Sequence, residues 1–110
     1  ADFDTAMIYV SDHGESLGEN GLYLHGLPYS MAPREQTQVP MLMWASPGFY
    51  ASRAQVDPEC VRRVAQQPTT HDAIFHTLLP IFGVEWPQYD PRLDLLHECR
   101  GPKLTALTAY

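Results

Sequence analysis

The stretch that decides the fold spans residues 6–15 and reads AMIYVSDHGE. It opens with a short, continuous apolar run, which indicates a strand covered on both faces, the pattern of parallel sheets. We place this strand at Thr5–Ser11. In open α/β sheets, ligands bind at the carboxyl ends of the strands. Asp12 and His13, which follow the strand directly, therefore stand where a functional site is expected.

Asp12 and His13 can share one divalent cation only if the strand has ended before them. Neighbouring side chains of a strand point to opposite faces, so the chain must turn for both to converge. Gly14 permits such a turn because it lacks Cβ. Zinc accepts nitrogen and oxygen donors at about 2.0–2.2 Å. The same short motif also fits a simple turn in which the aspartate begins the turn and the histidine is exposed.

The remaining chain predicts one more strand and several helices. Residues 14–38 are rich in Gly, Asn, Pro and Ser and indicate a long functional loop with room for a helical turn. A second apolar run predicts a strand at Val39–Ala45, which a Ser-Pro-Gly sequence ends. Pro58–Val64 suits a short helix with Asp57 as its N-cap.

The best helical pattern follows Thr70, which we expect to be its N-cap. Apolar residues at helical spacing continue to Pro80, which should kink or end the helix, and Gly83 should stop what remains. Residues 84–110 are expected to form a packed, irregular tail with a short turn of helix.

The composition excludes several classes of partner. The chain has 110 residues, enough for one small domain, and a net charge of -6. No basic stripe is available to neutralise phosphates, so nucleic acid is not an expected partner. The same charge argues against docking of this piece on an anionic membrane surface. No apolar run approaches the roughly 20 residues that a membrane-spanning helix needs.

Longer motifs extend the signal around Asp12 and His13. Residues 11–19 read SDHGESLGE, residues 23–29 read YLHGLPY and residues 32–36 read APREQ. These segments resemble the metal-site region of lipid A phosphoethanolamine transferases. That family includes the mobilised colistin-resistance enzymes and belongs to the alkaline phosphatase/sulfatase superfamily. The resemblance covers roughly residues 6–100 and is most specific over its first part.

The resemblance implies a fold and a cellular setting. It implies an α/β sandwich with a mostly parallel sheet flanked by helices, of which this chain holds only a part. Residues 1–110 would be the C-terminal part of a periplasmic catalytic domain in a bacterial inner-membrane protein. The N-terminal membrane region, through which the parent would contact the membrane, and the nucleophile-bearing part would lie upstream.

The resemblance also implies roles for four residues. Asp12 and His13 match zinc ligands of the family. His25 matches a histidine near the phosphoryl site, which can join a second metal or contact the transferred group. Glu15 could assist a second metal or orient a ligand histidine, although capping the turn after the strand suits it equally. A glutamate and a nucleophilic threonine would complete the site from outside this chain.

Other polar residues are expected to have structural roles. The serines do not lie in a Gly-x-Ser-x-Gly elbow, which favours turn or capping functions. Adjacent side chains at a helix start diverge by about 100°, so a His-Asp pair there favours capping over metal binding. These residues are Ser11, Ser16, His71, Asp72, His76 and His97.

The chain contains two cysteines, Cys60 and Cys99. The sequence alone is equally compatible with a disulfide and with two free buried thiols. No Cys-x-x-Cys pair indicates a metal site. The periplasmic setting that the resemblance implies favours the disulfide.

The resemblance implies the following reaction for the full-length parent. Phosphatidylethanolamine would donate phosphoethanolamine, through a covalent threonine intermediate, to a phosphate of lipid A, with zinc as the cofactor and polymyxin resistance as the result. Two alternatives stay open. The first is a hydrolase or phosphoglycerol transferase of the same superfamily, and the second is a non-catalytic fragment.

Overall fold

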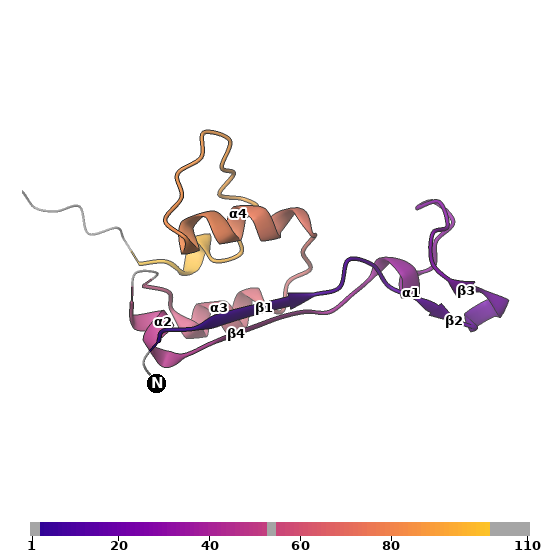
Figure 1. The fold of residues 1–110 in the computed structure, drawn as a ribbon, viewed down its shortest axis with the longest axis horizontal. Helices are drawn as coiled ribbons and strands as arrows, with labels where there is room; N and C mark the ends of the chain where they lie inside the picture. The colour runs from indigo at the N-terminus through magenta and orange to yellow at the C-terminus, as the bar shows by residue number, and fades with distance from the viewer. Residues whose placement is uncertain (1–2, 53–54, 102–110) are drawn as a thin grey trace, which may run out of the picture. The chain divides into compact units, whose positions relative to one another are not determined.

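The structure is a computed structural model that describes residues 3–52 and 55–101. These residues belong to two compact units (Figure 1). The hairpin unit comprises residues 6–44, and the helical unit comprises residues 1–5 and 45–110.

The hairpin unit begins and ends with a paired strand. β1 (Ala6–Val10) pairs with β4 (Met41–Ala45), which confirms both predicted strands to within two residues at each end. Thr5, just before β1, accepts a 2.8 Å hydrogen bond from the backbone N–H of Ser46, just after β4. The start of one strand therefore faces the end of the other, and the pair is antiparallel.

The faces of this strand pair carry exposed apolar side chains. Met7, Tyr9, Leu42 and Trp44 are each 52–56% exposed. The described strands form two separate two-stranded sheets, β1 with β4 and β2 with β3. The predicted burial of β1 on both faces is therefore wrong for the described chain, in which too little packs against the faces of β1 to bury its side chains. The mostly parallel sheet stays a prediction.

The segment between these strands is more regular than a loop. It contains β2 (Ser16–Leu17), the 3-10 turn η1 (Glu19–Gly21), β3 (Tyr23–Leu24) and α1 (Arg34–Thr37). β2 and β3 form an antiparallel hairpin in which Ser16 lies opposite Leu24. Asn20 in η1 has a left-handed φ of 54°, and Gly21 follows with 73°. Asn-Gly is the pair that favours such reversals, so turn chemistry explains the hairpin that the loop prediction missed.

The described residues of the helical unit form four short helices. Asp57 accepts a 3.0 Å hydrogen bond from the Glu59 N–H, as predicted for the N-cap of α3 (Pro58–Val64). The helix α2 (Pro47–Ala51) was not predicted, because the Ser-Pro-Gly sequence at its start suggested only the end of the preceding strand. Ser46 caps it by accepting a hydrogen bond from Phe49 N–H, with proline in the tolerated first position. The elements are α2 (Pro47–Ala51), α3 (Pro58–Val64), α4 (Asp72–Ile81) and η2 (His97–Cys99).

The predicted N-cap of α4 is wrong by one residue. His71 occupies the N-cap position, and Thr70 contributes its backbone carbonyl, which accepts the Ala73 N–H at 3.1 Å. Pro80 lies in the last turn, one residue before the helix ends, so it falls close to the predicted stop. Gly83 takes a left-handed φ of 68° and donates its N–H to the Pro80 carbonyl, which is the predicted glycine stop.

A disulfide between Cys60 and Cys99 joins α3 to η2. The cysteines are separated by 39 residues, and both are buried. In the chain-entropy model, closing a loop of this length stabilises the folded chain by about 4 kcal/mol. The disulfide prediction is confirmed. The other buried apolar residues of this unit are Phe49, Val56, Ala73 and Leu96.

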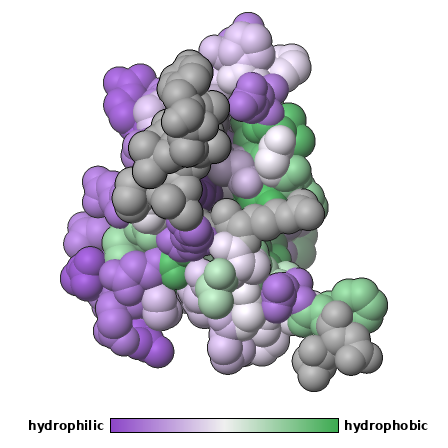
Figure 2. All heavy atoms as spheres, turned by 90° about the vertical axis from the view of Figure 1, so that its left-hand side faces the viewer, coloured by the Kyte–Doolittle hydropathy of each residue, from purple (hydrophilic) through white to green (hydrophobic). Residues whose placement is uncertain are grey.

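The surface retains large apolar side chains. Figure 2 shows hydrophobic residues in green among hydrophilic ones in purple on the face that it presents. Phe75, Phe82 and Trp86, on and after α4, are all more than half exposed. Among the described residues, every helix is too short or too polar to cross a membrane.

Thr77 links α4 to the tail of the helical unit, and its removal should cost stability. Its side chain is 1% exposed, donates to the Ala73 carbonyl at 2.7 Å and accepts the Leu95 N–H at 2.9 Å. Thr77→Val would leave that part-buried N–H unpaired, so we expect a loss of about 1–3 kcal/mol in urea unfolding followed by circular dichroism. Thr69→Val, at an exposed position, is the control. Equal midpoints for the two variants would contradict this account.

Candidate metal centre

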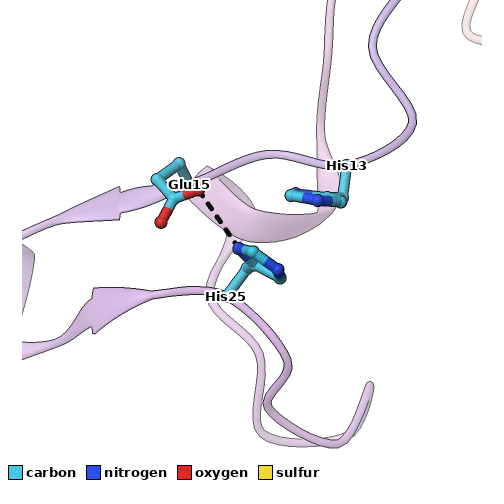
Figure 3. Close-up of side chains that lie close together, drawn as sticks. All are labelled: His13, Glu15 and His25. Carbon is cyan, nitrogen blue, oxygen red and sulfur yellow. Dashed lines mark hydrogen bonds and ion pairs between the residues drawn. The ribbon is translucent and has the colours of Figure 1, made fainter.

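The hairpin places Glu15 and His25 opposite each other. Glu15 precedes β2 and His25 follows β3, so the register that pairs Ser16 with Leu24 also brings these two residues face to face. The Nδ1 atom of His25 lies 3.1 Å from Oε2 of Glu15 (Figure 3). Leu24 has a left-handed φ of 66°, which is uncommon for a residue with a side chain and occurs immediately before His25.

His13 approaches the same point from the end of β1. Its ring centroid lies 3.8 Å from that of His25, and the planes are inclined by 30° (Figure 3). Nδ1 of His13 is 2.8 Å from the carbonyl oxygen of Gly14. A carbonyl only accepts hydrogen bonds, so Nδ1 must carry the proton. Nε2 of His13 is thereby left with a lone pair for a cation.

His13, Glu15 and His25 together fit a cation site. One donor atom from each residue lies within 4.8 Å of the others. Zinc bonds of about 2.1 Å place tetrahedral donors roughly 3.4 Å apart. Glu15 Oε2 and His25 Nδ1 lie 3.1 Å apart in a hydrogen bond, so His25 would offer a cation its other ring nitrogen. All three side chains are exposed. Two imidazoles and a carboxylate are a donor set that zinc accepts.

Asp12 lies beside this trio rather than within it. Its Oδ2 is 3.8 Å from Nε2 of His13, and its Oδ1 accepts the His13 N–H at 3.1 Å. The predicted pair of Asp12 and His13 is thus close enough to share a cation. The site consequently offers two donor pairs, Asp12 with His13 and Glu15 with His25.

A second layer of contacts holds the segment that carries these donors. Gly14 donates its N–H to the Gln36 carbonyl at 3.0 Å, and Gln36 Nε2 donates to the buried hydroxyl of Ser16 at 2.8 Å. Sequence reasoning assigned Ser16 a turn or capping role and overlooked Gln36. The Asn-Gly reversal was the available signal, because a hairpin there would have brought residues 14–16 into a defined structure.

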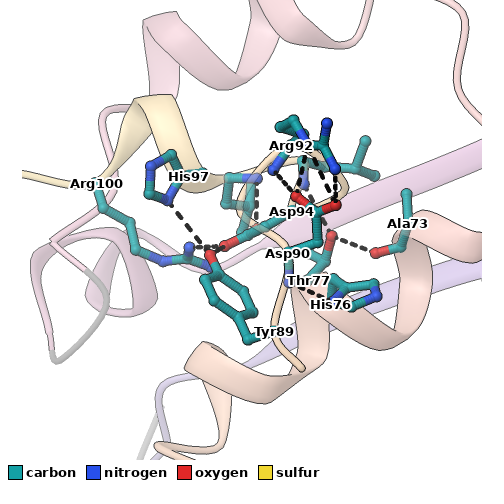
Figure 4. Close-up of polar contacts among 11 residues, drawn as sticks. Ala73, His76, Thr77, Tyr89, Asp90, Arg92, Asp94, His97 and Arg100 are labelled. Atoms are coloured by element: carbon teal, nitrogen blue, oxygen red, sulfur yellow. Dashed lines mark hydrogen bonds and ion pairs between the residues drawn. The ribbon is translucent and has the colours of Figure 1, made fainter. Parts of the chain in front are cut away.

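The helical unit contains a second polar cluster, around the buried carboxylate of Asp94. Asp94 forms an ion pair with Arg100, accepts the Tyr89 hydroxyl at 2.6 Å and accepts the Leu96 N–H at 2.9 Å (Figure 4). His97 Nδ1 lies 3.3 Å from the Tyr89 hydroxyl. These bonds fold the tail against itself, which agrees with a structural role for His97.

The remaining histidines also lie outside the metal candidate. His76 Nδ1 accepts the Asp90 N–H at 3.0 Å and so joins α4 to the tail, as a structural histidine would. Asp90 in turn pairs with Arg92, whose guanidinium holds the pKa of the Asp90 carboxyl at about 2 (Figure 4). His71 stands at the N-cap of α4 and makes no side-chain capping hydrogen bond there.

Comparison with known proteins assigns the family. The family model for sulfatases matches residues 1–84. The chain belongs to the sulfatase family. The superfamily of sulfatases and alkaline phosphatases generally depends on metal ions, which agrees with a cluster of side chains in the matched region that could hold a cation.

The similar proteins described next are all named as phosphoethanolamine transferases. Phosphoethanolamine transferase EptA of Escherichia coli K12 is 54% identical over 99 residues, which is 89% of this chain and 18% of that protein. The integral membrane lipooligosaccharide phosphoethanolamine transferase A of Neisseria meningitidis aligns with a TM-score of 0.84 at 42% identity, over 90% of this chain and 19% of that one. The C-terminal periplasmic domain of phosphoethanolamine transferase EptC of Campylobacter jejuni aligns with a TM-score of 0.72 at 38% identity, over 86% of this chain and 28% of that one. This sulfatase-family chain therefore spans about a fifth of the length of its curated relatives.

Gly14 should be irreplaceable for steric reasons. A Cβ at this position would lie 2.0 Å from the backbone oxygen of Glu35, so Gly14→Ala must push α1 away from the donor segment. We expect zinc affinity, measured by competition with a chelator, to fall by at least about tenfold. Gly83→Ala, in the helical unit, is the control, because a Cβ there meets nothing within 4 Å and only its left-handed φ is strained. Zinc affinity that falls equally in both variants would contradict the steric explanation.

The Asp94 cluster should make stability sensitive to alkaline pH. Burial, followed by the hydrogen bond to Asp94, raises the pKa of Tyr89 to about 12. The folded state therefore keeps the neutral phenol, and this contribution is complete below pH of about 10 and lost between about 10 and 12. Tyr89→Phe should flatten the fall of the urea midpoint over this range. Tyr29→Phe, at an exposed tyrosine, should leave the fall unchanged.

Proposed function

We propose that this chain is the C-terminal part of the periplasmic catalytic domain of a zinc-dependent phosphoethanolamine transferase. The convergence of His13, Glu15 and His25 at the open end of a hairpin carries the proposal. The similarity to a lipooligosaccharide phosphoethanolamine transferase supports the type of group transferred and the type of acceptor. The greater length of the relatives supports a longer parent protein that also contains a membrane region.

The proposed reaction moves phosphoethanolamine from phosphatidylethanolamine to a phosphate of lipid A. A threonine that lies outside residues 1–110 would be the nucleophile and would carry the phosphoethanolamine between the two half-reactions. Added ethanolamine brings positive charge to the outer membrane, which weakens the binding of cationic peptides such as polymyxins. In this setting β1 and β4 would join a larger, mostly parallel sheet, and helices packed on its faces would cover the apolar side chains that both strands expose.

Zinc would be held by residues at the end of β1 and at the hairpin. His13 offers Nε2, since its Nδ1–H is engaged with the Gly14 carbonyl, and Asp12 offers a carboxylate 3.8 Å away. When bound, zinc supplies positive charge that lowers the pKa of the nucleophile and offsets charge on the phosphoryl oxygens. Ligands from the proposed upstream part would complete the coordination.

Glu15 and His25 would act beside the first pair. The Glu15 carboxylate fixes the orientation of the His25 ring through their 3.1 Å contact. With Nδ1 directed to Glu15, His25 presents its other ring nitrogen to a second cation or to the transferred phosphoryl group. The stacked contact with His13 keeps both rings at one place.

Substitution of His13 in the full-length protein tests this function. We expect His13→Ala to lower phosphoethanolamine addition to lipid A by about 100-fold or more, because the metal contributes several kcal/mol of charge stabilisation. Mass spectrometry of lipid A measures the product. His71→Ala, at the start of α4, is the control and should retain wild-type levels.

Three results would contradict the proposal. They are unmodified lipid A from the wild-type protein, near-normal modification by His13→Ala, and modification by residues 1–110 alone. Release of free phosphate or sulfate from ester substrates by the wild-type protein, without transfer, would instead identify a hydrolase of the same family.

A further inference from the structure

Gln36 lies in α1, outside the sequence motif that carries the candidate ligands, and contacts that motif twice. Its backbone carbonyl accepts the Gly14 N–H at 3.0 Å. Its side-chain Nε2 donates to Ser16 Oγ at 2.8 Å. Gly14 and Ser16 are the two chain neighbours of Glu15, so one residue bonds the backbone on one side of this carboxylate and a side-chain hydroxyl on the other.

The environment of these contacts makes them firm. Gln36 is 6% exposed and Ser16 is 1% exposed, whereas the side chain of Glu15 is open to solvent. Hydrogen bonds between buried groups are stronger than those in water, because water does not compete for the partners. Glu15 is thus an exposed candidate ligand on a segment of chain that is held in place by buried hydrogen bonds. The position of this segment directs the Glu15 carboxylate, whose Oε2 orients the His25 ring through a contact of 3.1 Å with Nδ1.

The amide of Gln36 is only half satisfied among the described residues. Its Oε1 is buried and has no hydrogen-bond partner there. A buried acceptor without a partner destabilises the fold, and an apolar side chain of the same length would avoid that cost. Core filling therefore does not account for an amide at this position. The contribution that Met or Leu cannot replace is the directional bond to Ser16.

We propose that Gln36 is a positioning residue of the metal centre. It sets the orientation of Glu15 and, through Glu15, that of the His25 ring, without contacting the cation itself. The inference rests on one part of the proposed function, the binding of a metal, and does not depend on which reaction the protein catalyses. The direct contact of Gln36 is with the Ser16 hydroxyl, so Ser16 belongs to the same device.

Zinc affinity of the full-length protein tests the proposal. Gln36→Met preserves side-chain length and the backbone carbonyl that accepts Gly14 N–H, and it removes only the amide. We expect the zinc Kd, from competition with a chelator, to rise by about 10- to 100-fold, the usual effect of losing a group that orients a ligand. Ser16→Ala should have a similar effect. The double variant should be no worse than either single one, because both remove the same bond.

Matched controls separate this role from a structural one. Gln38→Met alters an exposed glutamine that follows the same helix and accepts a hydrogen bond from Arg34, and it should leave zinc affinity unchanged. The inference is overturned if Gln36→Met lowers the urea midpoint while the zinc Kd stays at its wild-type value. Additive effects of Gln36→Met and Ser16→Ala would overturn it as well.

The outcomes also separate this inference from the proposed reaction. Weaker zinc binding in both His13→Ala and Gln36→Met, in a protein that transfers no phosphoethanolamine, supports the inference and contradicts the reaction. Weaker binding in His13→Ala alone overturns the role of Gln36 and leaves the reaction intact. Unchanged binding in both variants places the metal elsewhere and overturns both.

Discussion

The register of β2 against β3 is the constraint on which the candidate site depends. Because Ser16 lies opposite Leu24, the next pair outward along the hairpin is Glu15 with His25. A shift of one residue would turn one of these side chains to the other face of the hairpin and separate the pair. The left-handed turn at Asn20 and Gly21 fixes this register from one end. The buried bond between Gln36 and Ser16 fixes it from the side.

The two units distribute their polar groups in opposite ways. In the helical unit, Asp94 is buried and paired with Arg100, and its hydrogen bonds close on neighbouring residues. Such a network stabilises the tail. In the hairpin unit, the buried polar groups are Ser16 and Gln36, while the donors that they support remain exposed. A metal centre requires this arrangement, in which buried hydrogen bonds hold the chain segment that carries exposed donor side chains.

Much of the local structure could be predicted from the sequence. The strands β1 and β4 followed from apolar runs, and α3 followed from Asp57 and Pro58 at its start. The disulfide was favoured only through the family resemblance, since spacing left free thiols open. The hairpin was missed because its strands have two residues each, too few for an alternating pattern to show. The start of α4 was placed one residue early because helix termini depend on backbone angles that composition does not set.

The candidate site was predicted in part for the same reasons. Asp12, His13, Glu15 and His25 were all named from motifs, and the structure brings the last three together, with Asp12 beside His13. Gln36 could not be found in this way, because its role depends on a contact with Ser16 across 20 residues of chain. The close approach of Gly14 to α1 is similarly invisible in the sequence, which predicted a turn at Gly14, whereas the bends fall at Asp12 and His13.

Anomalous X-ray scattering at the zinc edge, on crystals of the full-length protein, tests the central claim most directly. The claim is that this segment supplies the first ligands of a catalytic zinc. The account predicts an anomalous peak within about 2.0–2.2 Å of His13 Nε2 and of an Asp12 carboxylate oxygen, next to the Glu15–His25 pair. A zinc coordinated entirely by other residues would contradict it.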